Sequence, residues 1–167
     1  MRLSLCICLV LVSVPAGSFA QQSTTPGYTA FDQKQFAKLR AGVGTWNCTN
    51  VPAGKKPDVI TMAQQGNWFV SHETGDSPNT SYTRWSHGYQ HYFSATMDPL
   101  GDMTVAQTAD SDPFNATWTY AVPTMTPDKK PLLPYRVSLS GNTMVSQGGY
   151  YDNKSRLLHF KSTCVKQ

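Results

Sequence analysis

The chain has 167 residues, of which 40% are hydrophobic and 14% are charged, and its formal net charge is +4 at pH 7. Its Lys and Arg residues are scattered rather than clustered, which excludes the basic stripe typical of a nucleic-acid-binding protein. A chain of this length commonly forms one domain with an adequate core.

The first 20 residues have the features of a signal peptide. Arg2 precedes an apolar run from Leu3 to Val12, and small residues, Ser18 and Ala20, occupy the two positions that signal peptidase reads. We predict cleavage after Ala20. The run is about half as long as the roughly 20 apolar residues that a membrane-spanning helix needs. We therefore predict a secreted, periplasmic or extracellular protein with no membrane span in its mature form.

The remaining chain divides into two parts. Residues 21–30 mix Gln, Ser, Thr, Pro and Gly without periodicity, which predicts a flexible N-terminus. Residues 31–167 form the single predicted domain. No pattern in them indicates the oligomeric state.

The four cysteines indicate one disulfide. Cys6 and Cys8 lie inside the predicted signal peptide, so that Cys48 and Cys164 remain together in an oxidising compartment, where a bridge between them is the simplest interpretation. The alternative is two unrelated buried thiols. No second Cys or His lies at ligand spacing beside either residue, so no metal site is predicted.

One short helix is predicted near the start of the domain. Asp32 can cap it, Phe36 and Leu39 fall on one face, and Gly42 ends it.

Short alternating runs separated by Gly, Pro, Asn and Asp follow, at the spacing of an all-β barrel or sandwich. Gly66-Asn67 and Gly141-Asn142 are hairpin signals, because both dipeptides tolerate the positive φ of primed turns. The Pro-rich stretch 123–134 is predicted to be a long loop. The predicted strands are Val43–Asn50, Asp58–Gln65, Trp68–Thr74, Tyr82–His87, Tyr89–Met97, Met103–Thr108, Ala116–Val122, Tyr135–Ser140, Thr143–Gln147 and Arg156–Lys166.

The proposed bridge predicts how the sheet closes. Side chains alternate along a strand, so Trp46 and Cys48 share a face, as do Phe160 and Cys164. A disulfide between neighbouring strands needs both sulfurs on the same side, which pairs the first strand with the last. We therefore predict a closed antiparallel barrel of about nine or ten strands, without exposed edges.

A family resemblance accompanies this pattern. A short helix followed by Gly44-Thr45-Trp46 and about nine strands resembles the lipocalin-like (calycin) barrels. The stretch from Tyr92 to Asp102, followed by Asn115-Ala116-Thr117-Trp118-Thr119, is similar to secreted bacterial lipocalin-like proteins of unknown function. The resemblance implies a secreted barrel whose function is uncharacterised.

Histidines give little support for a cofactor. His87 and His91 have a spacing that serves metals on helices, but four residues of strand separate their Cα atoms by about 13 Å, too far for one ion. Only a bend at Gly88 would bring the two side chains together. Some small calycin-like barrels hold haem through a His near the C-terminal end, which brings His159 into consideration. That side chain lies on the face opposite Phe160 and Cys164, so no cofactor is predicted; haem stays an alternative, because a bulge in the strand would turn His159 inward.

Catalysis is an alternative that the sequence leaves open. No Ser-His-Asp set or phosphate-binding loop can be assembled from spacing. Barrel enzymes such as isomerases, cyclases and hydrolases could nevertheless use scattered inward side chains, for which His72, His91 and Asp98 are the candidates.

Aromatic alternation predicts a ligand pocket. A barrel of this size has an interior that is either filled or just wide enough for one small molecule. We predict that it binds a small apolar or amphipathic molecule. A structural or interaction module with a filled core is the third possibility. The predicted lining residues are Trp46, Trp68, Tyr89, His91, Phe93, Trp118, Tyr120 and Tyr135.

Overall fold

The computed structural model of the chain describes residues 28–54, 56–121, 132–152 and 154–167. The predicted signal peptide, residues 1–20, lies outside the described residues. So do most of the predicted N-terminal segment 21–30 and most of the predicted loop 123–134.

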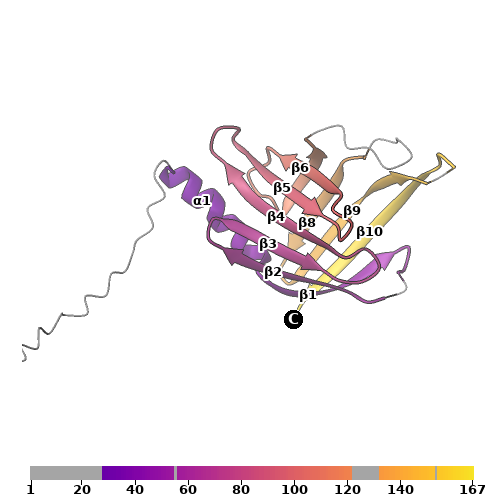
Figure 1. Cartoon of the computed structure of the whole chain (residues 1–167). Helices are drawn as coiled ribbons and strands as arrows, with labels where there is room; N and C mark the ends of the chain where they lie inside the picture. Colours follow the sequence, from indigo (N-terminus) through magenta and orange to yellow (C-terminus); the bar gives the residue numbers. More distant parts are fainter. Residues whose placement is uncertain (1–27, 55, 122–131, 153) are drawn as a thin grey trace, which may run out of the picture.

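The described residues form one helix, a single 3₁₀ turn and ten strands (Figure 1). The ten strands confirm the predicted all-β class. The elements are α1 (Ala30–Leu39), η1 (Arg40–Gly42), β1 (Gly44–Val51), β2 (Asp58–Gln65), β3 (Trp68–Glu73), β4 (Asn79–Ser86), β5 (His91–Met97), β6 (Met103–Thr108), β7 (Asn115–Tyr120), β8 (Tyr135–Ser140), β9 (Thr143–Tyr151) and β10 (Leu157–Lys166).

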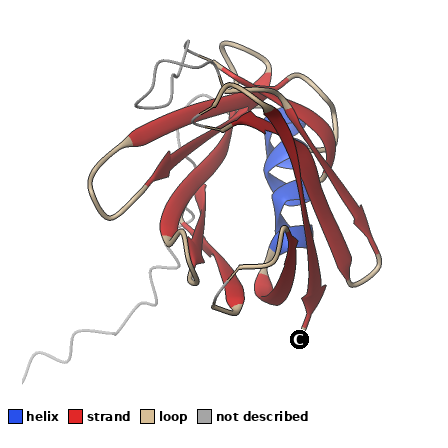
Figure 2. Cartoon of the chain, turned by 90° about the vertical axis from the view of Figure 1, so that its right-hand side faces the viewer, coloured by secondary structure: helices blue, strands red, loops and turns tan. Residues whose placement is uncertain are grey.

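The strands close into an antiparallel barrel. Each strand pairs with its neighbours in sequence, and β1 pairs with β10 to complete the ring. Viewed after a 90° turn, the strands curve around an axis and α1 is visible at the far end (Figure 2). The two predicted hairpin turns are confirmed. Their glycines have the positive φ expected of such turns, 60° at Gly66 and 55° at Gly141.

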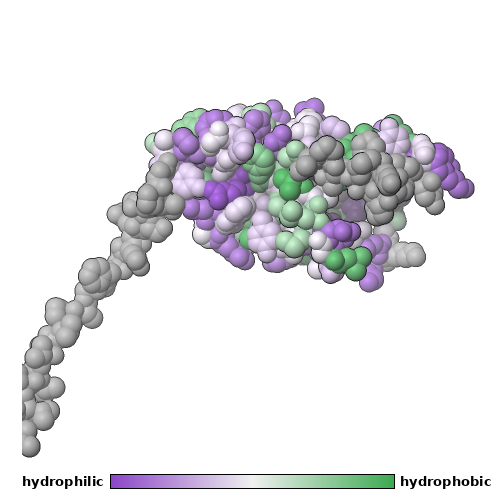
Figure 3. Space-filling model, turned by 45° about the horizontal axis from the view of Figure 1, so that its top comes forward, coloured by the Kyte–Doolittle hydropathy of each residue, from purple (hydrophilic) through white to green (hydrophobic). Residues whose placement is uncertain are grey.

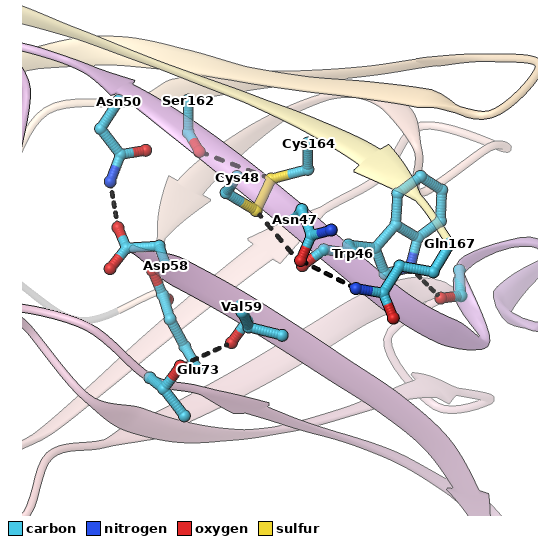
Figure 4. Close-up of a disulfide and its surroundings, with 12 residues drawn as sticks. Trp46, Asn47, Cys48, Asn50, Asp58, Val59, Glu73, Ser162, Cys164 and Gln167 are labelled. Atoms are coloured by element: carbon cyan, nitrogen blue, oxygen red, sulfur yellow. Dashed lines mark hydrogen bonds between the residues drawn. A yellow bond between two sulfur atoms is a disulfide. The ribbon is translucent and has the colours of Figure 1, made fainter. Parts of the chain in front are cut away.

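The disulfide joins the two strands that close the barrel. Cys48 of β1 lies directly opposite Cys164 of β10 in the register, and the two residues form a disulfide (Figure 4). Cys164 is almost fully buried. The predicted pairing of the first and last strands is therefore confirmed.

The helix begins earlier than predicted, because a different residue caps it. Thr29 is the N-cap, and its hydroxyl accepts a hydrogen bond from the Asp32 backbone N–H at 3.2 Å. Asp32 instead occupies the third helical position, where its carboxylate accepts from the Thr29 backbone N–H at 2.8 Å. This reciprocal arrangement is a capping box, so the prediction of Asp32 as the cap is wrong by three residues.

Helix α1 covers one end of the barrel, where the interior is packed solid. Trp46 is fully buried and donates its indole N–H to the Gly42 carbonyl at 2.8 Å. A Cβ on Gly42 would lie 2.3 Å from the Phe114 ring, so only glycine permits this close approach. Leu39 and Tyr92 complete the packing at this end.

The outer surface mixes polar and apolar residues. On the face drawn in Figure 3, hydrophobic residues occur in small groups among hydrophilic ones. Isolated exposed apolar side chains are normal for a folded protein and need no partner.

Candidate functional site

An inner cavity of about 200 Å³ lies inside the barrel next to the packed end. One part of its wall is apolar and largely aromatic, contributed by Trp118 and Phe114 near the helix end. Val137 and Met144 from β8 and β9 extend this apolar wall along the barrel axis. A ligand in this cavity would therefore meet a hydrophobic face on one side.

The opposite part of the wall consists of hydroxyl groups from three neighbouring strands, β3, β4 and β5. Ser81 Oγ lies 2.7 Å from Thr96 Oγ1, and Thr83 donates to Ser94 Oγ at 2.9 Å. Ser71 also lines this part of the cavity. Each hydroxyl pair uses one O–H internally and retains a second O–H and free lone pairs.

A second cavity of about 390 Å³ lies towards the other end of the barrel, and we call it the mouth cavity. Ile60, Met144 and Ser146 line both cavities, so the two adjoin along the barrel axis. Phe160 and Tyr150 add aromatic surface to the mouth cavity.

Polar groups from β1, β2 and β3 gather at the mouth cavity. Glu73 and Asn50 line it, and the Asn50 Nδ2 donates a hydrogen bond to the Asp58 carboxylate (Figure 4). The Asn50 Oδ1 is buried and has no hydrogen-bond partner. Glu73 accepts a hydrogen bond from the Asn79 Nδ2 at 2.7 Å. Burial and, to a smaller extent, the negative charge of Asp58 raise the pKa of Glu73 above its usual value.

The absence of a side chain at Gly75 leaves room for the Asp58 carboxylate. A Cβ at Gly75 would lie 1.4 Å from the Asp58 Oδ1, and the φ of Gly75 is +117°. Both the contact and the backbone conformation require glycine here. Asp58 is only 8% exposed, so this carboxyl group is buried next to Asn50, behind the wall of the mouth cavity.

Four of the predicted ligand-binding residues point into the barrel. Trp118 and Tyr135 line the inner cavity, with their rings parallel within 7° and the ring centroids 6.4 Å apart. Trp46 and Tyr120 belong to the packed core around it. Burial raises the pKa values of Tyr120 and Tyr135, so both phenols stay protonated at neutral pH.

The other four predicted ligand-binding residues lie outside the barrel, so their predicted inward placement is wrong. Trp68 is 40% exposed and stacks under Arg84, because Phe69 takes the inward position on β3. Tyr89 belongs to the turn between β4 and β5 and is 74% exposed. His91 and Phe93 share the outer face of β5, with ring centroids 6.3 Å apart. Their binding role stays a prediction that this placement does not favour.

The structure does not bring the predicted catalytic candidates together inside the barrel. His72 is exposed on β3, where its Nδ1 lies 3.0 Å from Thr80 Oγ1. The His91 Nδ1 contacts the Tyr89 carbonyl. Asp98 accepts hydrogen bonds from two backbone N–H groups in the turn after β5. The inward placement that the enzyme alternative requires is therefore wrong for both histidines.

The exposed His159 faces outward on β10, as the face pattern predicts. Among residues 28–54, 56–121, 132–152 and 154–167, no group of three His, Cys, Asp or Glu side chains is placed to hold a metal ion.

A buried network around Asp32 serves the fold rather than the cavity. The Asp32 carboxylate is fully buried and accepts hydrogen bonds from the Trp85 indole at 2.8 Å and from the His87 Nδ1 at 2.9 Å. Burial alone would raise its pKa, but the hydrogen bonds from Thr29, Trp85 and His87 outweigh this and lower the pKa below the usual range. Through the bond between Asp32 and Trp85, the network links α1 to β4.

Sequence reasoning did not select Glu73, Asn50 or the hydroxyl wall. The available signal for Glu73 was that it is the single Glu of the chain and lies in a strand with alternating polarity, where it could face the interior. Ser and Thr give no such signal, because they are common on outward faces.

Comparisons with protein-family models and with curated proteins found no significant match for this chain. No helix in the described part of the chain is long and apolar enough to cross a membrane. The function is therefore inferred from the geometry of the barrel interior.

Proposed function

We propose that this chain is a secreted lipocalin-like protein that binds one small amphipathic molecule inside its barrel. The observation that carries the proposal is the inner cavity, whose apolar wall around Trp118 and Val137 faces a hydroxyl wall that includes Thr83 and Ser94. The mouth cavity of about 390 Å³ extends the available space into the range common for small-molecule sites.

The two walls together disfavour ligands that are wholly apolar or wholly polar. A wholly apolar molecule would displace water from the hydroxyl wall without replacing its hydrogen bonds, at a cost of about 1–3 kcal/mol for each stranded group. A wholly polar molecule would gain nothing from the aromatic wall. The preferred ligand has one apolar face and one face with hydrogen-bonding groups.

The disulfide supports the secreted part of the proposal. Cys48 and Cys164 are the cysteines that remain after the predicted signal peptide, and they are bonded to each other. Disulfides of this kind persist in periplasmic and extracellular compartments.

A fluorescence titration with N-phenyl-1-naphthylamine tests binding in the cavity. We expect saturable enhancement with the native protein and its loss in Val137→Trp, because residue 137 lines the inner cavity and the larger ring fills it. Val165→Trp is the matched control, since Val165 is 50% exposed on β10. Equal affinities in both folded variants would refute binding inside the barrel.

A further inference from the structure

We propose that the mouth cavity binds the cationic amine of an amphipathic ligand, with Glu73 as the countercharge. This inference rests on the proposed function, because the apolar body of the ligand would occupy the barrel interior.

The Asn50 amide supports the acidic side of the mouth cavity. Its Nδ2 donates to the Asp58 carboxylate, while its Oδ1 is enclosed by the protein and does not face the cavity. Recognition of a cation therefore depends on Glu73, which lines the cavity and can accept from the three N–H donors of an ammonium group.

The charges around the mouth cavity favour a cation. Glu73 lines the cavity, and Asp58 adds a second carboxylate behind the wall. Burial and the Asp58 charge raise the pKa of Glu73, which means that its ionised form lacks sufficient compensation. A ligand cation provides that compensation. Lys161 also lines this cavity and opposes a cation, so its removal is an informative test.

The apolar part of the lining distinguishes an organic amine from a metal ion. Hard cations such as Ca²⁺ take six to eight oxygen ligands. Here Ile60, Met144 and Phe160 occupy much of the wall, and they match a hydrocarbon body. Since Ile60 and Met144 also line the inner cavity, a ligand held at the mouth can extend its body inwards.

Three probes with one carbon skeleton separate the head-group effect from the hydrophobic effect. Binding of 2-phenylethylamine, 2-phenylethanol and phenylacetate is measured at pH 7 by calorimetry, with NMR titration for weak affinities. We expect the amine to bind about 10- to 100-fold more tightly than the alcohol, as one hydrogen-bonded charge pair provides. Phenylacetate should bind most weakly.

Matched variants assign the preference to the mouth cavity. Glu73→Gln should remove the advantage of the amine over the alcohol, since it keeps an acceptor for Asn79 but loses the charge. Asp102→Asn makes the same change in net charge at an exposed turn and should leave the preference intact. Lys161→Gln should strengthen amine binding.

The pH dependence gives a readout that a structural role for Glu73 would not produce. Asp58 from β2 and Asn79 from β4 interact with Glu73, and Tyr150 from β9 and Lys161 from β10 line the same cavity. The amine stays protonated across the acidic range, as a Lys ammonium does. Amine affinity should therefore fall as the pH drops through the raised pKa of Glu73, while the affinity for the alcohol stays constant.

The outcomes separate the two proposals. Equal binding of the amine and the alcohol, blocked by Val137→Trp, would overturn the amine site and leave the binding function standing. An amine preference that survives Glu73→Gln would also overturn it. Absence of saturable binding for all three probes and for N-phenyl-1-naphthylamine would overturn both proposals.

Discussion

The disulfide permits a quantitative prediction about stability. Cys48 and Cys164 are 116 residues apart in the sequence, and replacing both by Ala removes the only covalent link between the first and last strands of the described barrel. In the chain-entropy model, a cross-link over a loop of that size destabilises the unfolded state by about 4.8 kcal/mol at 25 °C. Small domains are commonly stable by only about 5–15 kcal/mol, so the expected loss is a large share of the total.

The folded barrel itself should survive the substitution. β1 and β10 remain paired over the register from Trp46 to Val51, and the Ala side chains leave little empty space. The effect therefore lies mainly in the unfolded chain, which becomes more expanded. Because this expansion also raises the m value, the free energies of unfolding in water are compared rather than the urea midpoints.

Urea denaturation followed by tryptophan fluorescence measures the difference. The single variant Cys48→Ala should lose about as much stability as the double variant, because either change abolishes the cross-link. A loss below about 1 kcal/mol in both variants would refute the entropic argument. Two titratable thiols in the denatured, unreduced wild type without residues 1–20 would refute the bridge itself, because Cys6 and Cys8 lie in the removed segment.

Three further predictions concern buried groups. Trp46→Phe should lower the free energy of unfolding by about 1–3 kcal/mol through the unsatisfied Gly42 carbonyl, whereas Trp68→Phe on the outer face should change it by under about 0.5 kcal/mol, as chemical denaturation would show. Asp32→Asn should be destabilising at pH 7, and its deficit against the wild type should shrink as the pH falls below 3.8. The stability that a lowered pKa contributes is complete above that ordinary value and is lost progressively below it, so an unchanged deficit at pH 3 would contradict this. The raised pKa of Glu73 has the opposite sign, so wild-type stability should decline relative to Glu73→Gln as the pH rises from 4.5, and parallel urea curves across that range would count against it.

The strands and the closure of the barrel were predictable because alternation and turn residues are local signals. Gly66 and Gly141 marked two hairpins, and the pairing of Cys48 with Cys164 tied together strands that no local pattern could connect. The N-cap was missed because both Thr29 and Asp32 are good capping residues, and the reciprocal bond uses both.

The inward face of β5 was not predictable from polarity. His91 and Phe93 form a more aromatic row than Tyr92 and Ser94, yet the latter pair faces inward. The predicted strand began at Tyr89, which placed Tyr89, His91 and Phe93 on one inward face. In the structure Gln90 has a φ of 53°, so Tyr89 belongs to the turn and the alternation starts only at His91. A cavity wall built of hydroxyls removes the polarity contrast on which such predictions depend.

The sheet order has a consequence for folding kinetics. Every other neighbouring pair of strands is consecutive in the sequence and can form as a local hairpin, but β1 and β10 must meet across the whole barrel. The entropy of closing so long a loop makes this contact expensive until the intervening hairpins have formed. We therefore expect oxidation of Cys48 and Cys164 to be a late event in a refolding time course, so that the rate at which thiols disappear measures the rate at which the ring closes.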